Sequence, residues 1–162
     1  DAEARTKVVV ETLIQAGYIV EVLDISIANF DRQTGKTAMD GLIATHGQNI
    51  EVVISNNDAM ALGAIESLME KGYFIDTDKN GKIDRDSEVW TPVVGIDGLD
   101  FAMEQIDAGY LYGTVFNDSQ NMAEAIVELA NLLINGEDVS NLSFTITNGK
   151  YIWISYKKIT NQ

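Results

Sequence analysis

Residues 51–68 read EVVISNNDAMALGAIESL, and this stretch decides the fold class. A short apolar run at 52–54 stops at two asparagines and an aspartate, and an apolar pattern with spacings of three and four residues follows from Met60. We therefore expect a buried strand, a polar turn, and a helix that either Asn57 or Asp58 caps. Ligands of open α/β sheets bind beyond the carboxyl ends of strands, so this turn is a candidate binding position.

The rest of the chain repeats this alternation. Helical patterns start at Asp1, Ala38, Ala102 and Met122. Candidate strands cover residues 18–23, 92–96 and 111–116. An Asn-Gly pair at 148–149 separates the apolar runs 144–147 and 151–156, which predicts a hairpin. The alternation predicts one α/β domain over residues 1–162, with a mainly parallel sheet and helices on both faces.

Composition excludes several function classes. The chain has 162 residues and carries 25 acidic against 11 Lys and Arg side chains, a net charge of −14. Nucleic acid and anionic membranes both attract basic surfaces, so neither is an expected partner. The absence of cysteine excludes thiolate chemistry, and His46 is the single histidine, which leaves no Ser-His-Asp order to propose. A pair of carboxylates acting as in glycosidases stays open, but nothing singles one out.

Three expected strands end in polar side chains: Asn57, Asp97 and Asn117. In a parallel sheet these ends share one edge, and neighbouring strands lie about 5 Å apart. Amides donate and accept while carboxylates accept, which suits a neutral ligand rich in hydroxyl groups. Phe30, in a loop after another candidate strand, either covers the apolar side of such a ligand or belongs to the core.

An acidic loop at 76–88 matches the spacing of calcium ligands. The matching residues, at positions one, three, five, seven and nine, are Asp76, Asp78, Asn80, Lys82 through its carbonyl, and Asp84. Gly81 and Ile83 occupy the expected glycine and apolar positions. The twelfth position is Ser87, flanked by Asp86 and Glu88, so the bidentate ligand stays open. The sequence favours a structural calcium over a solvated acidic insertion, at the sheet edge opposite the ligand.

Together these motifs resemble the periplasmic galactose/glucose-binding proteins. The matching stretches are DAEAR at 1–5, EVVISNNDAMALGAIESL at 51–68, VVGIDGL at 93–99 and GTVFNDSQNMA at 113–123. The resemblance covers nearly the whole chain, and a weaker one extends to pentose- and hexose-binding proteins and repressor lobes. That family binds a monosaccharide between two α/β lobes that close about a hinge.

The resemblance assigns roles to individual residues. It implies sugar hydrogen bonds from Asp1, Arg5, Asn57, Asp97 and Asn117. It places Phe30 where the family stacks an aromatic ring on the sugar, and it leaves the capping role to Asp58. Glu51 matches a glutamate of the family's structural calcium site, whose other ligands lie upstream in the family and are absent here.

The resemblance also implies that this chain is a C-terminal portion of a binding protein. The strand before Asp1 would then be missing from the centre of the sheet, and residues 119–147 would lack the other lobe as packing partner. A vacant sheet position invites pairing, so we expect the chain to dimerise, swap elements or rearrange.

The implied function is non-enzymatic binding of galactose or glucose for ABC-type import, with chemotaxis as an additional role open to it. The implied location is periplasmic or extracellular, at the membrane through the transporter or a lipid anchor. The alternative is the effector lobe of a sugar-responsive repressor, which would need a basic helix-turn-helix that this chain lacks. A third reading is an enzyme of α/β type.

Overall fold

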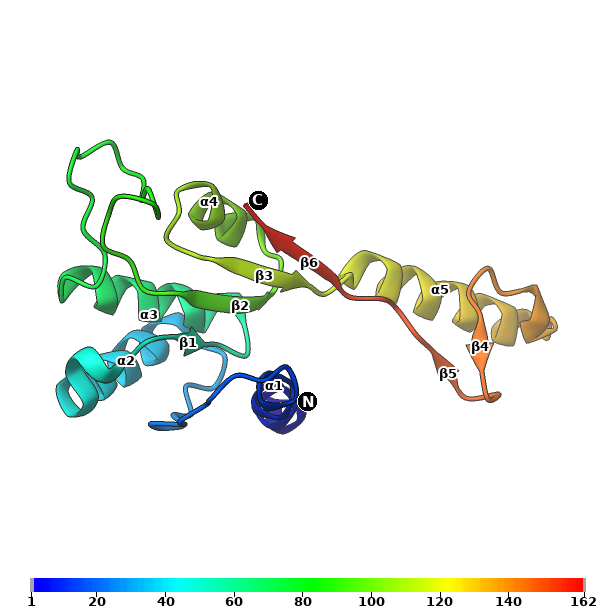
Figure 1. The fold of residues 1–162 in the computed structure, drawn as a ribbon. Coiled ribbons are helices and arrows are strands. Elements are labelled where there is room, and N and C mark those ends of the chain that lie inside the picture. Colours follow the sequence, from blue (N-terminus) through cyan, green and yellow to red (C-terminus); the bar gives the residue numbers. More distant parts are fainter. Residues whose placement is uncertain (1, 162) are drawn as a thin grey trace. The chain divides into compact units, whose positions relative to one another are not determined.

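The computed structural model describes residues 2–161 and divides the chain into two compact units (Figure 1). The first unit comprises Asp1–Val115 and Lys158–Gln162, and the second comprises Phe116–Lys157.

Helices and strands alternate in the first unit. Its elements are α1 (Ala2–Gln15), α2 (Arg32–His46), the 3-10 turn η1 (Gly47–Asn49), β1 (Val53–Ile54), α3 (Asp58–Glu70), β2 (Val93–Asp97), α4 (Asp100–Asp107), β3 (Gly113–Phe116) and β6 (Lys157–Thr160). The sheet has the order β1-β2-β3-β6, and β1 pairs with β2 in parallel, with Val53 opposite Val93. The arrow of β6 runs against that of β3 in Figure 1. The predicted α/β class with a mainly parallel sheet is confirmed.

One apolar core joins α2, α3, β2 and α4. Its fully buried side chains include Met39, Ile65, Leu68, Val93 and Leu111. The helix α3 contributes most because small residues alternate with large ones along it, and Gly63 lets its backbone approach α2 closely. A Cβ on Gly63 would lie 2.0 Å from the carbonyl oxygen of Arg32. This close packing holds α3, whose first turn borders the candidate site, against α2.

The second unit contains one long helix and a hairpin. Its elements are α5 (Ser119–Asn135), the 3-10 turn η2 (Val139–Asn141), β4 (Ile146–Thr147) and β5 (Tyr151–Ile152). The predicted hairpin is confirmed: β4 and β5 pair antiparallel around Asn148 and Gly149, which have φ values of 53° and 65°. Apolar side chains of this unit stay exposed, among them Ile126, Ile134 and Trp153.

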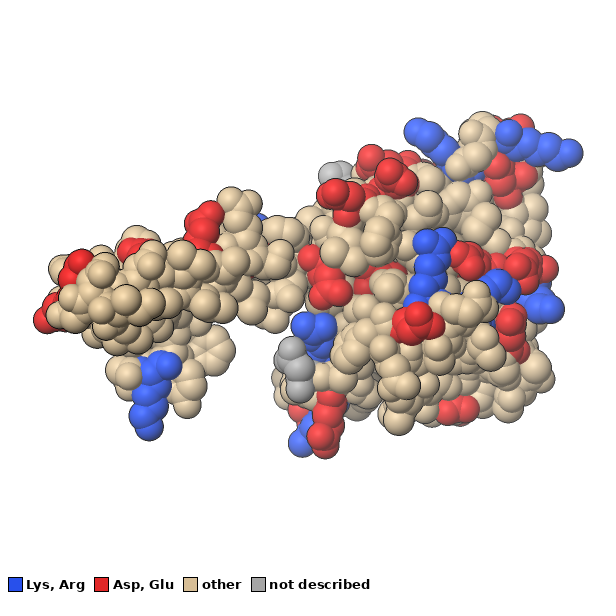
Figure 2. Space-filling model, turned by 180° about the vertical axis from the view of Figure 1, so that it is seen from behind, with Lys and Arg blue, Asp and Glu red and all other residues tan. Residues whose placement is uncertain are grey.

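Charged side chains are distributed unevenly over the molecule. Acidic groups predominate on the face seen in Figure 2, and much of the second unit, at the left of that view, is uncharged there. Over the described residues, no helix combines the length and apolarity that crossing a bilayer requires.

The prediction of a strand at 18–23 is wrong. These residues have no regular secondary structure, and Tyr18, Ile19 and Val22 are exposed. The composition favours a strand, but a strand also needs a hydrogen-bonded neighbour, and β1 stands at the end of the sheet without pairing to this segment. A cavity of about 1030 Å³ lies instead between α1, residues 18–26, α2 and β1.

The predicted strand at 151–156 is also too long. It ends at Ile152, and an unpredicted strand, β6, begins at Lys157. β5 pairs with β4, and β6 lies next to β3 in the other sheet. One continuous β-forming stretch therefore forms two strands with different partners.

Candidate functional site

The turn after β1 carries Asn57, which is buried and makes two hydrogen bonds through its side chain. Its Oδ1 accepts from the backbone N–H of Met60 at 3.0 Å, and its Nδ2 donates to the carbonyl oxygen of Phe30 at 3.3 Å. Asn57 is therefore the N-cap of α3. These two bonds use one N–H and one lone pair, and the amide has a second of each, so capping and ligand binding are compatible.

Asp97 ends β2 with an unusual backbone. Its φ is 126°, a value that side-chain-bearing residues rarely adopt, and such strain concentrates at functional positions. Burial raises the pKa of the Asp97 carboxyl above its ordinary value of 3.8, the negative charge of Asp58 raises it further, and the positive charge of Arg5 acts in the opposite direction. The carboxylate is a half-buried acceptor with a cation nearby.

Arg5 approaches this position from α1. Its Nη1 donates to the backbone oxygen of Asn56 at 2.8 Å. The side chain of Asn56 donates in return to the hydroxyl of Thr6 at 2.8 Å and to the carbonyl oxygen of Ala2 at 3.3 Å. These contacts dock the start of α1 on the end of β1. Arg5, Asn57 and Asp97, predicted from separate stretches, thus lie in one region.

The remaining predicted sugar contacts have other placements. Phe30 is half exposed and has a φ of 60°, and its carbonyl rather than its ring contacts Asn57. Asn117 directly follows β3 and belongs to the second unit, in which the neighbouring Asp118 caps α5 by accepting from Asn121. Asp1 lies outside the described residues. Residues 119–147 fall entirely within the second unit.

Asp58 does not cap α3, contrary to the prediction. It is fully buried, and its Oδ2 accepts from the backbone N–H groups of Gly98 at 2.8 Å and Leu99 at 3.0 Å. Its Oδ1 accepts from the Thr114 hydroxyl at 2.7 Å. An N-cap must precede the helix, and Asn57 holds that position. No local sequence signal pointed to this role, because the three donors lie 40, 41 and 56 residues further along the chain.

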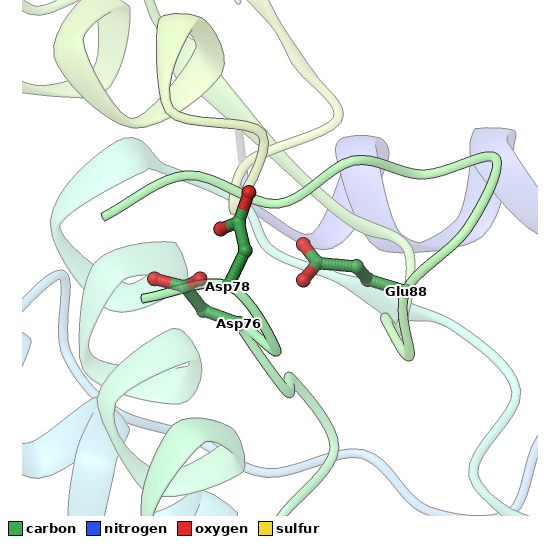
Figure 3. A group of neighbouring side chains, drawn as sticks. All are labelled: Asp76, Asp78 and Glu88. Carbon is green, nitrogen blue, oxygen red and sulfur yellow. The ribbon is translucent and has the colours of Figure 1, made fainter. Parts of the chain in front are cut away.

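The acidic loop brings three carboxylates together. Asp76, Asp78 and Glu88 each offer an oxygen within 4.8 Å of the others, and Figure 3 shows Glu88 reaching toward the two aspartates. Glu88 accepts from the backbone N–H of Thr77 at 2.5 Å and from its hydroxyl at 2.6 Å, and the hydroxyl bond is the main cause of a lowered pKa for Glu88. Of the two residues that flank position twelve, it is therefore Glu88 that faces the loop's first ligands.

The other predicted metal ligands differ in their contacts. Asn80 donates to Asp78 through Nδ2 at 2.9 Å, and its Oδ1 accepts from the backbone N–H of Lys82. Asp84 accepts from the Ser87 hydroxyl, which lowers the pKa of Asp84. Glu51 is exposed, lies two residues before the first residue of β1 and is not part of the acidic group.

The insertion that carries this loop is anchored by Arg85. The guanidinium donates to the carbonyl oxygens of Gly109 at 3.2 Å and Leu111 at 2.7 Å. It also lies 5.2 Å and 4.9 Å from the ring centroids of Trp90 and Tyr112, within cation–π range. Because Gly109 and Leu111 precede β3, the insertion lies at the amino end of the strands, away from Asn57 and Asp97.

Three comparisons place the chain among known proteins. The profile of the periplasmic binding protein domain matches residues 1–138. The D-galactose/methyl-galactoside binding periplasmic protein MglB of Haemophilus influenzae is 39% identical over 86% of this chain and 38% of its own length. The ribose import binding protein RbsB of Bacillus subtilis is 29% identical over 74% of this chain and 34% of its own length.

Solved structures agree. A solute-binding protein of an ABC transporter from Bacillus halodurans, with bound myo-inositol, superposes with a TM-score of 0.70 at 31% identity, over 93% of this chain and 44% of that one. The chain thus spans well under half the length of the relatives it matches. With the profile covering most of its residues and these relatives in agreement, the chain belongs to the periplasmic binding protein domain family.

Proposed function

We propose that the protein binds a monosaccharide, galactose or glucose, as one lobe of a two-lobed solute-binding protein that supplies an ABC-type importer. The observation that carries the proposal is the convergence of Arg5, Asn57 and Asp97 at the carboxyl ends of β1 and β2. This is where open α/β sheets bind ligands. Catalysis is no part of the proposal, since the relatives are binding proteins.

The chemistry of these side chains supports a polyhydroxylated ligand. Each sugar hydroxyl donates one hydrogen bond and accepts others, so it needs an acceptor and a donor on the protein. Asp97 offers acceptor oxygens, Arg5 offers donors, and Asn57 offers both. Hydrogen bonds to charged groups are stronger than those between neutral ones, so Asp97 and Arg5 would contribute most.

The choice of galactose or glucose rests on one relative. MglB, at 39% identity, is named for D-galactose and methyl-galactoside, whereas other relatives are named for ribose or xylitol. The higher identity to MglB favours a hexose. Asn117 and Phe30 complete the proposed set of contacts, with Asn117 as a further amide donor and Phe30 as the apolar face. Asp1 is proposed as an additional acceptor.

An NMR titration tests the proposal on the 162-residue chain. We expect galactose or glucose at millimolar concentrations to shift the backbone amides of Asn57, Gly98 and Leu99, and ribose and myo-inositol to shift them less. The variant Asp97→Asn should lose the response, whereas Asp107→Asn, at the other end of α4, should keep it. Identical spectra with and without every sugar would refute the proposal.

We also propose that Asp76, Asp78 and Glu88 hold a structural calcium ion. Three carboxylates in a loop with Asn80 and the backbone carbonyl of Lys82 supply the oxygen ligands that Ca²⁺ prefers. Asp84 would contribute from the ninth position, directly or through water. Glu51 is proposed to serve a separate calcium site completed by residues outside this chain.

For the chain by itself we propose self-association through the outer edge of β1. The apolar segment at 18–23 has no strand partner, β1 has no neighbour on its outer side among the described strands, and an apolar-lined cavity of about 1030 Å³ lies between them. An open strand edge beside unpaired β-forming sequence favours strand exchange between two copies.

Light scattering over a dilution series tests this association. We expect a dimer that dissociates on dilution. Ile19→Lys should shift the chain to the monomer, while Ile134→Lys, at another exposed isoleucine, in the second unit, should not. A monomer at every concentration, or equal effects of both variants, would argue against the edge of β1 as the interface.

The relatives also support a location for the protein. Several are named as periplasmic or ABC transporter proteins. We propose a periplasmic or extracellular location, at the membrane through the transporter or a lipid anchor, and transporter membrane subunits as partners. Fractionation of cells that express the protein from its own gene would test this location, and recovery in the cytosol would contradict it.

A further inference from the structure

Asp58 is a buried acidic side chain that neither caps its own helix nor belongs to the predicted site. It is the first residue of α3, and its carboxylate has no exposed surface. Burying a carboxylate is costly unless hydrogen bonds replace the lost water. Here three donors do so: the N–H groups of Gly98 and Leu99 and the hydroxyl of Thr114. The carboxylate thereby links α3, the β2–α4 turn and β3.

This carboxylate also lies at the start of α4. The N-cap residue of α4 is Leu99, whose side chain cannot accept a hydrogen bond. The Asp58 carboxylate accepts from the N–H groups of Leu99 and Gly98, directly ahead of the first turn of α4. A negative charge is favoured there by the dipoles of α3 and α4, both of which begin at this point.

Gly95 makes room for the carboxylate. A Cβ at this position of β2 would lie 2.2 Å from Oδ1 of Asp58 and 3.3 Å from its Cα, closer than atoms pack. The glycine in the middle of a strand would ordinarily weaken it. Here the missing side chain of Gly95 leaves the space beside β2 that the Asp58 carboxylate occupies.

The hydrogen bonds of Asp58 hold the turn that follows Asp97. The two N–H groups that Asp58 binds belong to the two residues that follow Asp97, whose φ of 126° is unfavourable without support. We propose that Asp58 is a positioning residue for Asp97: it holds the β2–α4 turn in the one conformation that presents the Asp97 carboxylate at the end of β2. The part of this inference that concerns ligand binding rests on the proposed function.

The test compares Asp58→Asn with Thr114→Val. Asp58→Asn keeps the shape but removes the charge and places an amide donor among three donors. Thr114→Val removes one donor and leaves the carboxylate on the turn. We expect amide hydrogen exchange at Gly98 and Leu99 to become at least about tenfold faster in Asp58→Asn, because bonds to a charged acceptor are lost. In Thr114→Val, exchange at these two amides should stay close to wild type.

A second readout distinguishes positioning from general stability. The pH midpoint of the Asp97 carboxyl, followed by carbon NMR, should fall in Asp58→Asn because a neighbouring negative charge disappears, and it should stay in place in Thr114→Val. Arg5 is the other charged group acting on Asp97, and it is unchanged in both variants. If Asp58→Asn folds poorly, Gly95→Ala displaces the same carboxylate while keeping its charge, and faster exchange at Gly98 and Leu99 is again expected.

Sugar titration of the same variants separates this inference from the proposed function. Weaker binding by at least about tenfold in Asp58→Asn, with wild-type binding in Thr114→Val, is the expected result. A wild-type chain that binds no sugar refutes the proposed function, while the exchange and titration data still decide the role of Asp58. Unchanged exchange at Gly98 and Leu99 and an unchanged Asp97 midpoint in Asp58→Asn would overturn the inference.

Discussion

Gly109 lies directly against the backbone of Ile83: a Cβ on Gly109 would be 2.3 Å from the carbonyl oxygen of Ile83. The two residues join the acidic insertion to the α4–β3 connection, together with a hydrogen bond of 2.7 Å from the N–H of Ile83 to the carbonyl oxygen of Ala108. Ile83 is buried, whereas the loop around it is largely exposed. The insertion is therefore held at this point rather than along its length.

Gly109→Ala should release the insertion. Gly109 and Gly72 have similar φ values, +85° and +80°, but nothing lies within 4 Å of a Cβ on Gly72. Gly72→Ala should therefore cost only the conformational strain, about 1–2 kcal/mol. Gly109→Ala should cost about 1–3 kcal/mol more because of overpacking. Urea unfolding of both variants measures the difference, and equal costs would show that the Ile83 contact is unimportant.

Arg85→Lys should loosen the same anchor. Lysine keeps the charge but cannot donate to the carbonyl oxygens of Gly109 and Leu111 together, nor lie flat beside Trp90. We expect a loss of about 1–2 kcal/mol in unfolding free energy. The control is Arg32→Lys, an exposed arginine bonded to Glu66, which should change stability by less than about 1 kcal/mol. Indistinguishable variants would contradict the anchoring role.

Asp97→Asn should stabilise the protein at neutral pH. The pKa of Asp97 is raised in the folded state, mainly by burial, so the folded protein holds this proton more tightly than the unfolded chain. The stability due to Asp97 is therefore fully present below its unfolded pKa and is lost as pH rises through the folded pKa. Above this pH window the variant should have a higher unfolding free energy than the wild type. The difference should vanish below about pH 3.8.

Asp118→Asn should show the opposite pH dependence. Hydrogen bonds from the side chain and backbone of Asn121 lower the pKa of Asp118, so its stability is present above the unfolded pKa and is lost as pH falls through the folded one. The variant should be less stable than the wild type at neutral pH, and this difference in stability should disappear in acid. Thermal unfolding between pH 2 and 7 measures Asp97→Asn and Asp118→Asn. Stability differences from the wild type with the same sign in both variants would contradict the causes given for the two pKa shifts.

Replacements of Asn57 should separate its two roles. Asn57→Ala removes the cap of α3 and should cost about 1 kcal/mol. Asn57→Ser keeps an oxygen that can accept from Met60 but loses the amide donor, so it should recover most of the stability and none of the sugar response. Chemical unfolding and NMR titration give the two readouts. Full sugar response in Asn57→Ser would show that the amide donor does not contact the ligand.

Calcium should raise the melting temperature of the chain. Binding to the folded state alone adds about 2.7 kcal/mol at a hundred times the dissociation constant. Asp78→Asn should remove the gain because Asp78 belongs to the carboxylate group, whereas Glu51→Gln should keep it because Glu51 lies outside that group. A chelator reverses the shift in the wild type. A gain that survives Asp78→Asn would place calcium elsewhere.

The sequence alone determined which segments form regular elements and which residues end the strands. Helical spacing, terminal glycines and the Asn-Gly turn are local signals, so the helices α1 to α5, the strands β1 to β3 and the β4–β5 hairpin were predictable. The convergence of Asn57 and Asp97 also follows from local motifs, because parallel topology places strand ends together. Arg5 lies on α1 and was predicted only through the family resemblance.

Only the tertiary structure decided which strands pair and which hydrogen-bond partners the side chains find. Residues 18–23 have the composition of a strand without a neighbouring strand, and residues 151–160 divide between two neighbours. Asn57 and Asp58 are adjacent and both suit a cap, yet the geometry of the helix start gives the cap to Asn57 and sends Asp58 into the interior, toward donors from residues 98, 99 and 114. Such donors are distant in sequence, and a hydrogen bond to them depends on the packing of α3 against β2 and β3, which no local pattern encodes.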